Sequence, residues 1–219
     1  MNTPFNFHLT QFSNEAEILR YEVREFLSDA LKDISKETRA ETWYGADEEF
    51  SKKVGKKGWI GLNWPKEYGG AGRSAMERYV ILEEMLTAGA PVGAHWISDR
   101  QSGPLIIRYG TEKHQKELLP GILKGESYFC IGMSEPDSGS DLAALRTKAE
   151  KKDNIYIVNG TKLWTSGAHR CQYMIACFRT SQEEDRHGGL SQFIVDLSLP
   201  GITIRPIIDL AGRHHFNEV

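Results

Sequence analysis

The sequence has few cysteines and no excess of positive charge, and each shortage excludes a class of protein. Cys130, Cys171 and Cys177 are odd in number and include no CxxC pair, so neither a disulfide framework nor a zinc site is indicated. The formal net charge of the 219 residues is -3, and the pI is near 6.2. No overall basic field therefore favours binding to nucleic acid or to an anionic membrane.

Long apolar runs are also absent. No stretch approaches the roughly 18 apolar residues that a membrane span requires. Residues 1–20 are polar and contain acidic side chains, without the basic and apolar regions of a secretion signal. With 40% hydrophobic and 26% charged residues, the composition is typical of a soluble globular protein. We expect reduced thiols, no membrane span and a cytoplasmic location.

Helical spacing of apolar residues dominates the first part of the chain. Ser13, followed by two glutamates, suits the capped start of a helix over residues 13–34. Four more helical patterns are separated by glycine and proline. They lie within residues 47–62, where the helix is expected to end near Gly58, and within residues 74–89, 90–110 and 111–126. Five helices in succession predict an all-α domain over residues 1–126.

The spacing of apolar residues changes from helical to strand-like after about Ser127. Short segments rich in β-branched and aromatic residues alternate with turn residues about every ten positions. The strands are expected within residues 128–134, 145–152, 154–166, 171–181, 191–198 and 201–207. Asn159-Gly160 predicts a type I′ hairpin turn, because both central residues of that turn favour φ > 0. We therefore expect an α+β protein, with an antiparallel β-barrel or sandwich domain over residues 127–219.

Two features of the β-part suggest a ligand site. In a regular strand Trp164 and Ser166 share one face, opposite Leu163 and Thr165. A flat indole beside a hydroxyl suits a planar heteroaromatic ligand, which the indole can stack on and the hydroxyl can hydrogen-bond. The alternative is a core tryptophan beside a solvated serine, since single aromatic residues are usually buried.

The second feature is the turn "MSEPDSGSD", residues 133–141, which contains three serines and three carboxylates. Backbone N–H groups beside Ser138, Gly139 and Ser140 could form a nest for a phosphate or pyrophosphate. The alternative is a turn that stabilises itself through hydrogen bonds between its own side chains and backbone.

These segments carry a resemblance. "CIGMSEPDSGSDL" and "VNGTKLWTSGA", preceded by "WPKEYGG" and "GTEKHQKELLPGILKGE", are similar in order, content and spacing to the acyl-CoA dehydrogenase family of flavoproteins. The similarity spans nearly the whole chain. It implies an N-terminal helical domain and a middle β-domain, with FAD between the β-domain and a C-terminal helical bundle.

The family's functional positions fall on seven residues of this sequence. The resemblance assigns flavin-ring contacts to Gly132, Met133 and Ser134, and it assigns the pyrophosphate-binding turn to Gly139 and Ser140. The resemblance also assigns a contact with the thioester ligand to Ser140. Trp164 falls on the tryptophan that packs on the isoalloxazine, and Ser166 on the hydroxyl near flavin N5, where many relatives have threonine. "TSGAH" after Trp164 departs from the family's common "ITN" pattern.

The activity implied by the resemblance is FAD-dependent α,β-dehydrogenation of an acyl-CoA thioester. An electron-transfer flavoprotein is the expected electron acceptor, and the family's tetramers suggest a homo- or hetero-oligomer. The chain stops at "HHFNEV", within an expected strand, so the fold is expected to be truncated before the bundle that supplies the catalytic carboxylate. No catalytic residue or metal site is therefore assigned, and Glu135 and Asp141 are expected to brace the turn. The isolated chain is expected to be inactive.

Two other functions remain open at this point. One is a non-catalytic subunit that pairs with a complete relative in a hetero-oligomer. The other is an oxidase or flavin monooxygenase on the same fold, which would differ in its reactivity with oxygen.

Overall fold

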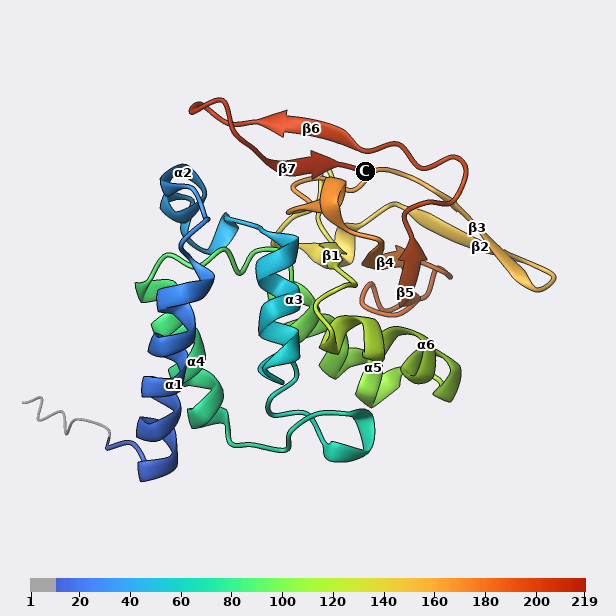
Figure 1. Ribbon diagram of the computed structural model, residues 1–219. Coiled ribbons are helices and arrows are strands. Elements are labelled where there is room, and N and C mark those ends of the chain that lie inside the picture. Colours follow the sequence, from blue (N-terminus) through green and yellow to red (C-terminus); the bar gives the residue numbers. More distant parts are fainter. Residues whose placement is uncertain (1–10) are drawn as a thin grey trace, which may run out of the picture.

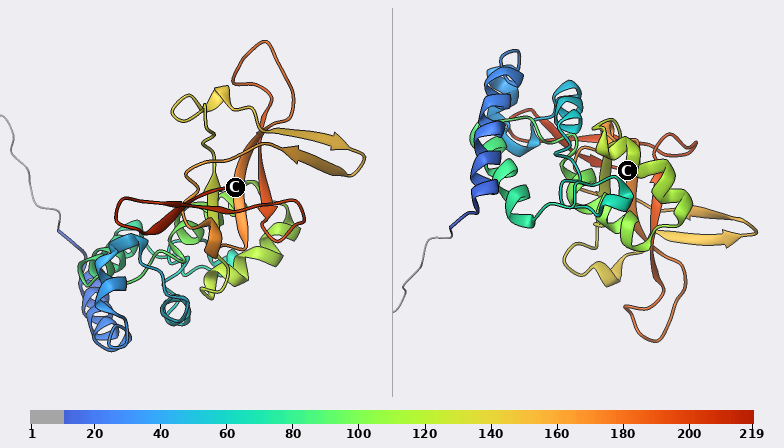
Figure 2. Two further views of the ribbon diagram at one scale, coloured as in Figure 1. Left: turned by 90° about the horizontal axis from the view of Figure 1, so that it is seen from above. Right: turned by 60° about the horizontal axis from the view of Figure 1, so that its bottom comes forward.

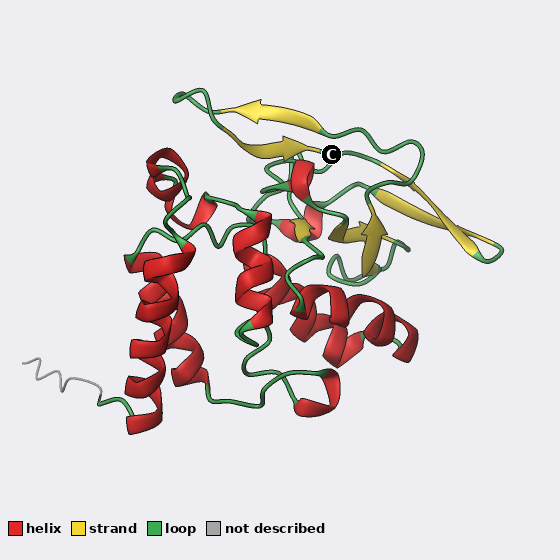
Figure 3. Ribbon diagram, viewed as in Figure 1, coloured by secondary structure: helices red, strands yellow, loops and turns green. Residues whose placement is uncertain are grey.

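The computed structural model describes residues 11–219, apart from the side chain of Thr42. Helices fill the first part of the chain and strands the second (Figures 1 and 3). The α-helices are α1 (Asn14–Ala30), α2 (Lys36–Ala40), α3 (Glu48–Lys56), α4 (Ala75–Thr87), α5 (Gly103–Tyr109) and α6 (Glu112–Leu123). The helices expected from the first, second, third and fifth patterns are confirmed, whereas the short helix α2 was not expected.

The helix α1 begins and packs as its sequence predicts. The Ser13 hydroxyl accepts a hydrogen bond from the Ala16 amide at 3.3 Å, which satisfies one of the free N–H groups of the first turn. Leu19, Val23 and Leu27 form a buried stripe along the helix. The resulting helical core extends to Phe129 and Ile175 in the β-part, so it also covers one face of two strands.

The helix expected over residues 90–110 is confirmed only in its later part. Residues 96–109 are helical and include a π-helical segment, Ser98–Ser102, directly before α5, whereas residues 90–95 contain only a bridge, turns and irregular backbone. A Cβ on Gly93 would lie 2.7 Å from the Tyr44 carbonyl oxygen, so this backbone is packed directly against the chain before α3. Within the π-segment, the buried Asp99 carboxylate accepts hydrogen bonds from the Gly61 amide (2.7 Å) and from Arg78 (2.6 Å). Tertiary contacts of Gly93 thus accompany the loss of helix at the start of this segment, and those of Asp99 fix its π-helical part.

The strands form a five-stranded sheet and a separate two-stranded ladder. They are β1 (Phe129–Gly132), β2 (Lys148–Lys152), β3 (Ile155–Asn159), β4 (Tyr173–Arg179), β5 (Leu190–Asp196), β6 (Arg205–Ile208) and β7 (His214–Glu218). The sheet order is β1-β4-β2-β3, with β5 paired to β4, and β6 pairs with β7. The helical-then-β architecture is confirmed. The expectation of purely antiparallel pairing is wrong, because β4 runs parallel to both β1 and β2.

The hairpin turn lies elsewhere than expected. β2 and β3 pair from Lys148 opposite Asn159 to Lys152 opposite Ile155, so Asp153 and Asn154 make the turn, with Asp153 at φ 52°. This hairpin projects from the rest of the molecule in both views of Figure 2. Gly160 instead permits a close approach, because a Cβ there would lie 2.3 Å from the Thr147 hydroxyl oxygen. The hairpin predicted at Asn159-Gly160 is therefore wrong.

Among residues 11–219, no helix is both long and apolar enough to cross a membrane.

Candidate functional site

The segment that carries Trp164 and Ser166 pairs with β7, and it contains one residue more than the stretch of β7 that it faces. Lys162 and Val219 exchange both backbone hydrogen bonds, at 2.8 and 2.9 Å, and Thr165 and Asn217 do the same at 2.9 and 3.1 Å. Three residue steps on one side therefore match two on the other, which is the count of a β-bulge. The strand expected through residues 161–166, after a turn at Asn159-Gly160, is therefore not regular: β3 ends at Asn159 and no strand is assigned to residues 160–166.

The bulge places Trp164 in an unusual state. Its φ of 59° is in the left-handed region, which non-glycine residues rarely adopt and which often marks a functional site. The side chain is 56% exposed, so the alternative of a core tryptophan is wrong. Thr165 is fully buried, whereas Trp164 is exposed and Ser166 half-buried, so burial still alternates along these three residues. An exposed indole held in a strained backbone is available for stacking.

The end of β1 lies against the same segment. The Leu163 amide donates a hydrogen bond to the Ser134 carbonyl at 2.8 Å, and the Lys162 ammonium donates one to the Met133 carbonyl at 3.0 Å. Met133 and Ser134 are thereby brought next to Trp164. Gly132 has a packing role as well, because a Cβ there would lie 2.5 Å from the Met174 sulfur.

The turn after β1 is stabilised by its own hydrogen bonds and also leaves backbone N–H groups free, so it has features of both alternatives considered for it. Ser138 is buried, exchanges both backbone hydrogen bonds with Glu135, and donates from its hydroxyl to the Asp141 carbonyl at 2.8 Å. Gly139 and Ser140 are exposed, and in the described part of the chain nothing accepts a hydrogen bond from their amides. A Cβ on Gly139 would meet no atom within 4 Å, so the fold itself does not require glycine there. Ser138 thus stabilises the turn, while Gly139 and Ser140 offer free donors.

Glu135 and Asp141, the two carboxylates expected to brace the turn, both have structural partners. Glu135 is buried, and it accepts hydrogen bonds from the amides of Arg146 (2.6 Å) and Thr147 (3.0 Å) and from Lys162 (2.9 Å). Burial alone would raise the pKa of Glu135, but these donors outweigh it and the pKa is lowered. The exposed Asp141 pairs with Arg186, which lowers the pKa of Asp141. Each carboxylate braces a segment next to the site.

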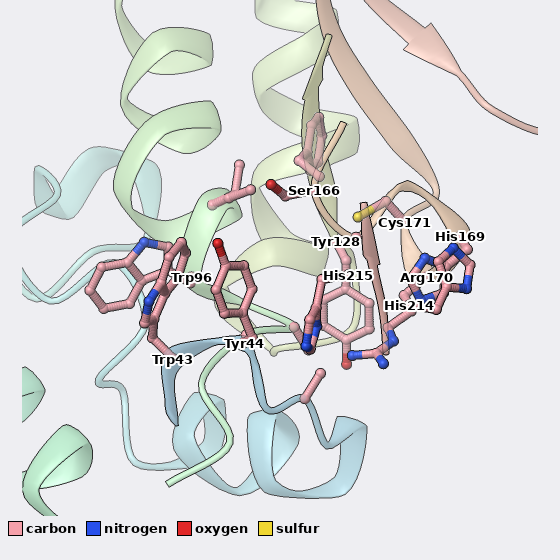
Figure 4. Close-up of a pocket in the computed structure, with 16 residues that line it drawn as sticks. Trp43, Tyr44, Trp96, Tyr128, Ser166, His169, Arg170, Cys171, His214 and His215 are labelled. Carbon is pink, nitrogen blue, oxygen red and sulfur yellow. The ribbon is translucent and has the colours of Figure 1, made fainter. Parts of the chain in front are cut away.

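Ser166 lines a different part of the site, a narrow cavity between the helical and β-parts (Figure 4). Trp43, Tyr44 and Trp96 form one wall of this cavity, and the Tyr44 ring lies against His215, with 4.7 Å between ring centroids. Sequence reasoning missed Trp43 and Tyr44 in this wall. The adjacent aromatic residues in "TWY" were their only signal, since nothing in the sequence places them opposite a segment more than 100 positions away.

Comparison with known proteins identifies the family. Sequence models of the "Acyl-CoA dehydrogenase, N-terminal domain" and the "Acyl-CoA dehydrogenase, middle domain" match residues 13–126 and 130–218. The chain therefore belongs to the acyl-CoA dehydrogenase family.

Individual relatives agree with this assignment. The acyl-CoA dehydrogenase IpdE1 of Mycobacterium tuberculosis is 36% identical over 94% of this chain and 55% of its own length. The structure of the ChsE4-ChsE5 complex from Mycobacterium tuberculosis is 34% identical, with a TM-score of 0.84 over 96% of this chain and 54% of that chain. A glutaryl-CoA dehydrogenase from Mycobacterium smegmatis in complex with FADH2 is 25% identical, with a TM-score of 0.77 over 94% of this chain and 52% of that chain. The chain spans about half the length of these relatives.

Proposed function

We propose that this chain supplies the FAD-binding and thioester-facing walls of an acyl-CoA dehydrogenase that acts on the α,β bond of an acyl-CoA. The observation that carries the proposal is Trp164, an indole 56% exposed at φ 59° beside the carbonyl of Ser134. The residues present fit FAD: the indole offers a stacking surface for the ring, and the unpartnered amides of Gly139 and Ser140 offer donors for a pyrophosphate.

Each of the seven residues has a proposed role. Gly132, Met133 and Ser134 would contact the edge of the flavin ring, Trp164 would stack on it, and the Ser166 hydroxyl would lie near N5. Gly139 and Ser140 would hold the pyrophosphate, and Ser140 would also contact the thioester ligand. These residues would hold FAD, which would supply the hydride-accepting chemistry for oxidation of the substrate β-carbon.

Abstraction of the α-proton is not assigned to this chain. Glu135 and Asp141 lie next to the proposed flavin site, but both already accept hydrogen bonds from other groups. We therefore propose that the catalytic base comes from residues outside this sequence, on the same polypeptide or on a partner. Full activity is proposed only for an assembly that includes that base.

The proposed partners follow the family. They are an acyl-CoA thioester as substrate, an electron-transfer flavoprotein as electron acceptor and further subunits in a homo- or hetero-oligomer. A cytoplasmic location is proposed because Cys130, Cys171 and Cys177 are all free thiols. The second candidate function is a non-catalytic subunit of a hetero-oligomeric acyl-CoA dehydrogenase, and the similarity to a protein of the ChsE4-ChsE5 complex favours it.

FAD titration separates the two candidates. Saturable quenching of flavin fluorescence by the purified chain, weakened in Trp164→Ala, supports a flavin-binding role. A folded chain that binds no FAD would instead support the non-catalytic subunit. Dye-linked oxidation of a panel of acyl-CoA thioesters then tests activity, and the isolated chain is expected to show none.

A further inference from the structure

Lys162 is a buried cation in the β-part. Only 2% of the residue is exposed, and its ammonium lies 2.9 Å from a Glu135 carboxylate oxygen, 3.0 Å from the Met133 carbonyl oxygen and 5.6 Å from the centre of the Phe178 ring. Lysine is almost never fully buried unless it is paired. Removing two charges from water is costly, and a buried pair is often no more stabilising than apolar residues of similar volume. Stability alone is therefore a weak reason for the pair.

The geometry of the pair suggests another reason. The Lys162 side chain holds the carbonyl of Met133, and the amide of the next residue, Leu163, holds the carbonyl of Ser134 at 2.8 Å. The Lys162 backbone is itself fixed to Val219 by two hydrogen bonds. Two consecutive residues thus bind two consecutive carbonyls at the end of β1, immediately before Trp164.

Glu135 extends the connection into the turn. Its carboxylate accepts the amides of Arg146 and Thr147 in addition to the Lys162 ammonium. Those two amides belong to the chain that follows the turn. The Lys162 ammonium is therefore the group that connects the Glu135 carboxylate to the segment of Trp164. Without Lys162, only the single bond from Leu163 to Ser134 would join the two segments here, within the described part of the chain.

We propose that Lys162 is a positioning residue, whose ammonium locks the end of β1 and the Trp164 bulge together as one rigid edge for the flavin ring. It does not touch the reacting atoms. It acts through the Met133 carbonyl and the Glu135 carboxylate. The inference rests on the proposed function for its consequence in FAD binding, but the locking itself can be measured in the chain alone.

The test compares three variants with the unaltered chain. Lys162→Met keeps the length of the stem and removes the ammonium. The double variant Glu135→Gln/Lys162→Met also removes the stranded buried carboxylate and so separates positioning from stability. Lys151→Met, on the exposed hairpin, is the matched control. Hydrogen exchange of the Leu163 amide reports the locking directly, and FAD affinity reports its consequence.

The expected result is at least tenfold faster exchange of the Leu163 amide in Lys162→Met and in the double variant. Lys151→Met should leave the rate unchanged, and the double variant should recover much of the melting temperature that the single variant loses. FAD affinity should fall at least tenfold in both Lys162 variants. If Leu163 protection returns together with the melting temperature in the double variant, Lys162 is only a stabilising residue and the inference is overturned. If the exchange result holds and the unaltered chain binds no FAD, the proposed function fails while the locking stands.

Discussion

Asn217 holds Thr165 by three hydrogen bonds: the two residues exchange both backbone bonds, and the Asn217 side-chain amide donates to the Thr165 carbonyl at 2.9 Å. Both residues are fully buried. Because Thr165 is fixed in this way, the extra residue of the bulge must be accommodated before it, at Leu163 and Trp164. The exposed, left-handed Trp164 is thus a consequence of a pairing made more than 50 residues further along the chain.

The buried His95 predicts a pH-dependent stability. Burial lowers the pKa of His95 to about 4, and its Nδ1 lies 2.8 Å from the Ser51 hydroxyl oxygen. Between about pH 6.5 and 4 the unfolded chain binds a proton at this imidazole that the folded protein does not, so the free energy of unfolding falls as the pH drops. The loss attributable to His95 should be on the order of 3 kcal/mol. Urea unfolding measured at several pH values in this range gives the free energy of unfolding as a function of pH. This free energy should fall less steeply with decreasing pH in His95→Gln than in the exposed control His187→Gln. Equal pH dependence in the two variants would contradict the assignment.

Two adjacent glutamates on α4 should differ sharply in their contribution to stability. The Glu84 side chain is 8% exposed and accepts hydrogen bonds from Arg20 and Arg24 on α1, whereas the Glu83 side chain is 35% exposed. Glu84→Ala removes charged hydrogen bonds from a largely buried site and should cost about 1.5–3 kcal/mol. Glu83→Ala should cost less than about 1 kcal/mol. Chemical denaturation of both variants measures the two free energies of unfolding. Similar losses in the two variants would show that the buried ion pairs of Glu84 contribute no more to the α1–α4 contact than the exposed pair of Glu83.

Alanine substitution at Gly103 should affect stability, whereas alanine substitution at Gly139 should affect FAD binding. A Cβ on Gly103 would lie 2.0 Å from the Trp64 ring, so Gly103→Ala should lower the free energy of unfolding by about 1–3 kcal/mol. A Cβ on Gly139 would meet nothing within 4 Å, so Gly139→Ala should change stability by less than about 0.5 kcal/mol. FAD binding should nevertheless weaken in Gly139→Ala, because the added methyl group lies at the proposed pyrophosphate nest. Unchanged FAD affinity in Gly139→Ala would remove the turn from the site.

Local signals in the sequence predicted much of the fold. The serine cap and apolar stripe of α1 act within one helix, and the apolar run of β4 is long enough to be recognised as a strand without knowledge of its neighbours. The order of helices followed by strands could therefore be predicted, and the resemblance located the candidate site on Trp164 and on the turn after β1.

The errors share a physical cause, because each depends on a distant segment. Asn159-Gly160 has the composition of a hairpin turn, yet Gly160 is needed for the close approach of Thr147, and Asp153 turns the chain instead. The sequence analysis did not single out Lys162, because its burial depends on the Glu135 carboxylate, 27 positions earlier, and on the Met133 carbonyl. Periodicity and residue preference carry no information about such pairings.

The most direct test of the central claim, that the β-part presents a flavin-binding surface centred on Trp164, is equilibrium titration of FAD with the purified chain. Flavin fluorescence and visible absorption would be followed for the unaltered chain, Trp164→Ala and the control Tyr21→Ala, an exposed aromatic residue on α1, with circular dichroism confirming that each is folded. Stacking on an aromatic side chain is worth about 1–3 kcal/mol per base, and every 1.4 kcal/mol is about tenfold in affinity. The account predicts saturable binding that weakens about tenfold or more in Trp164→Ala and little in Tyr21→Ala. Equal FAD affinity for the unaltered chain and a folded Trp164→Ala variant, or no binding by either, would contradict it.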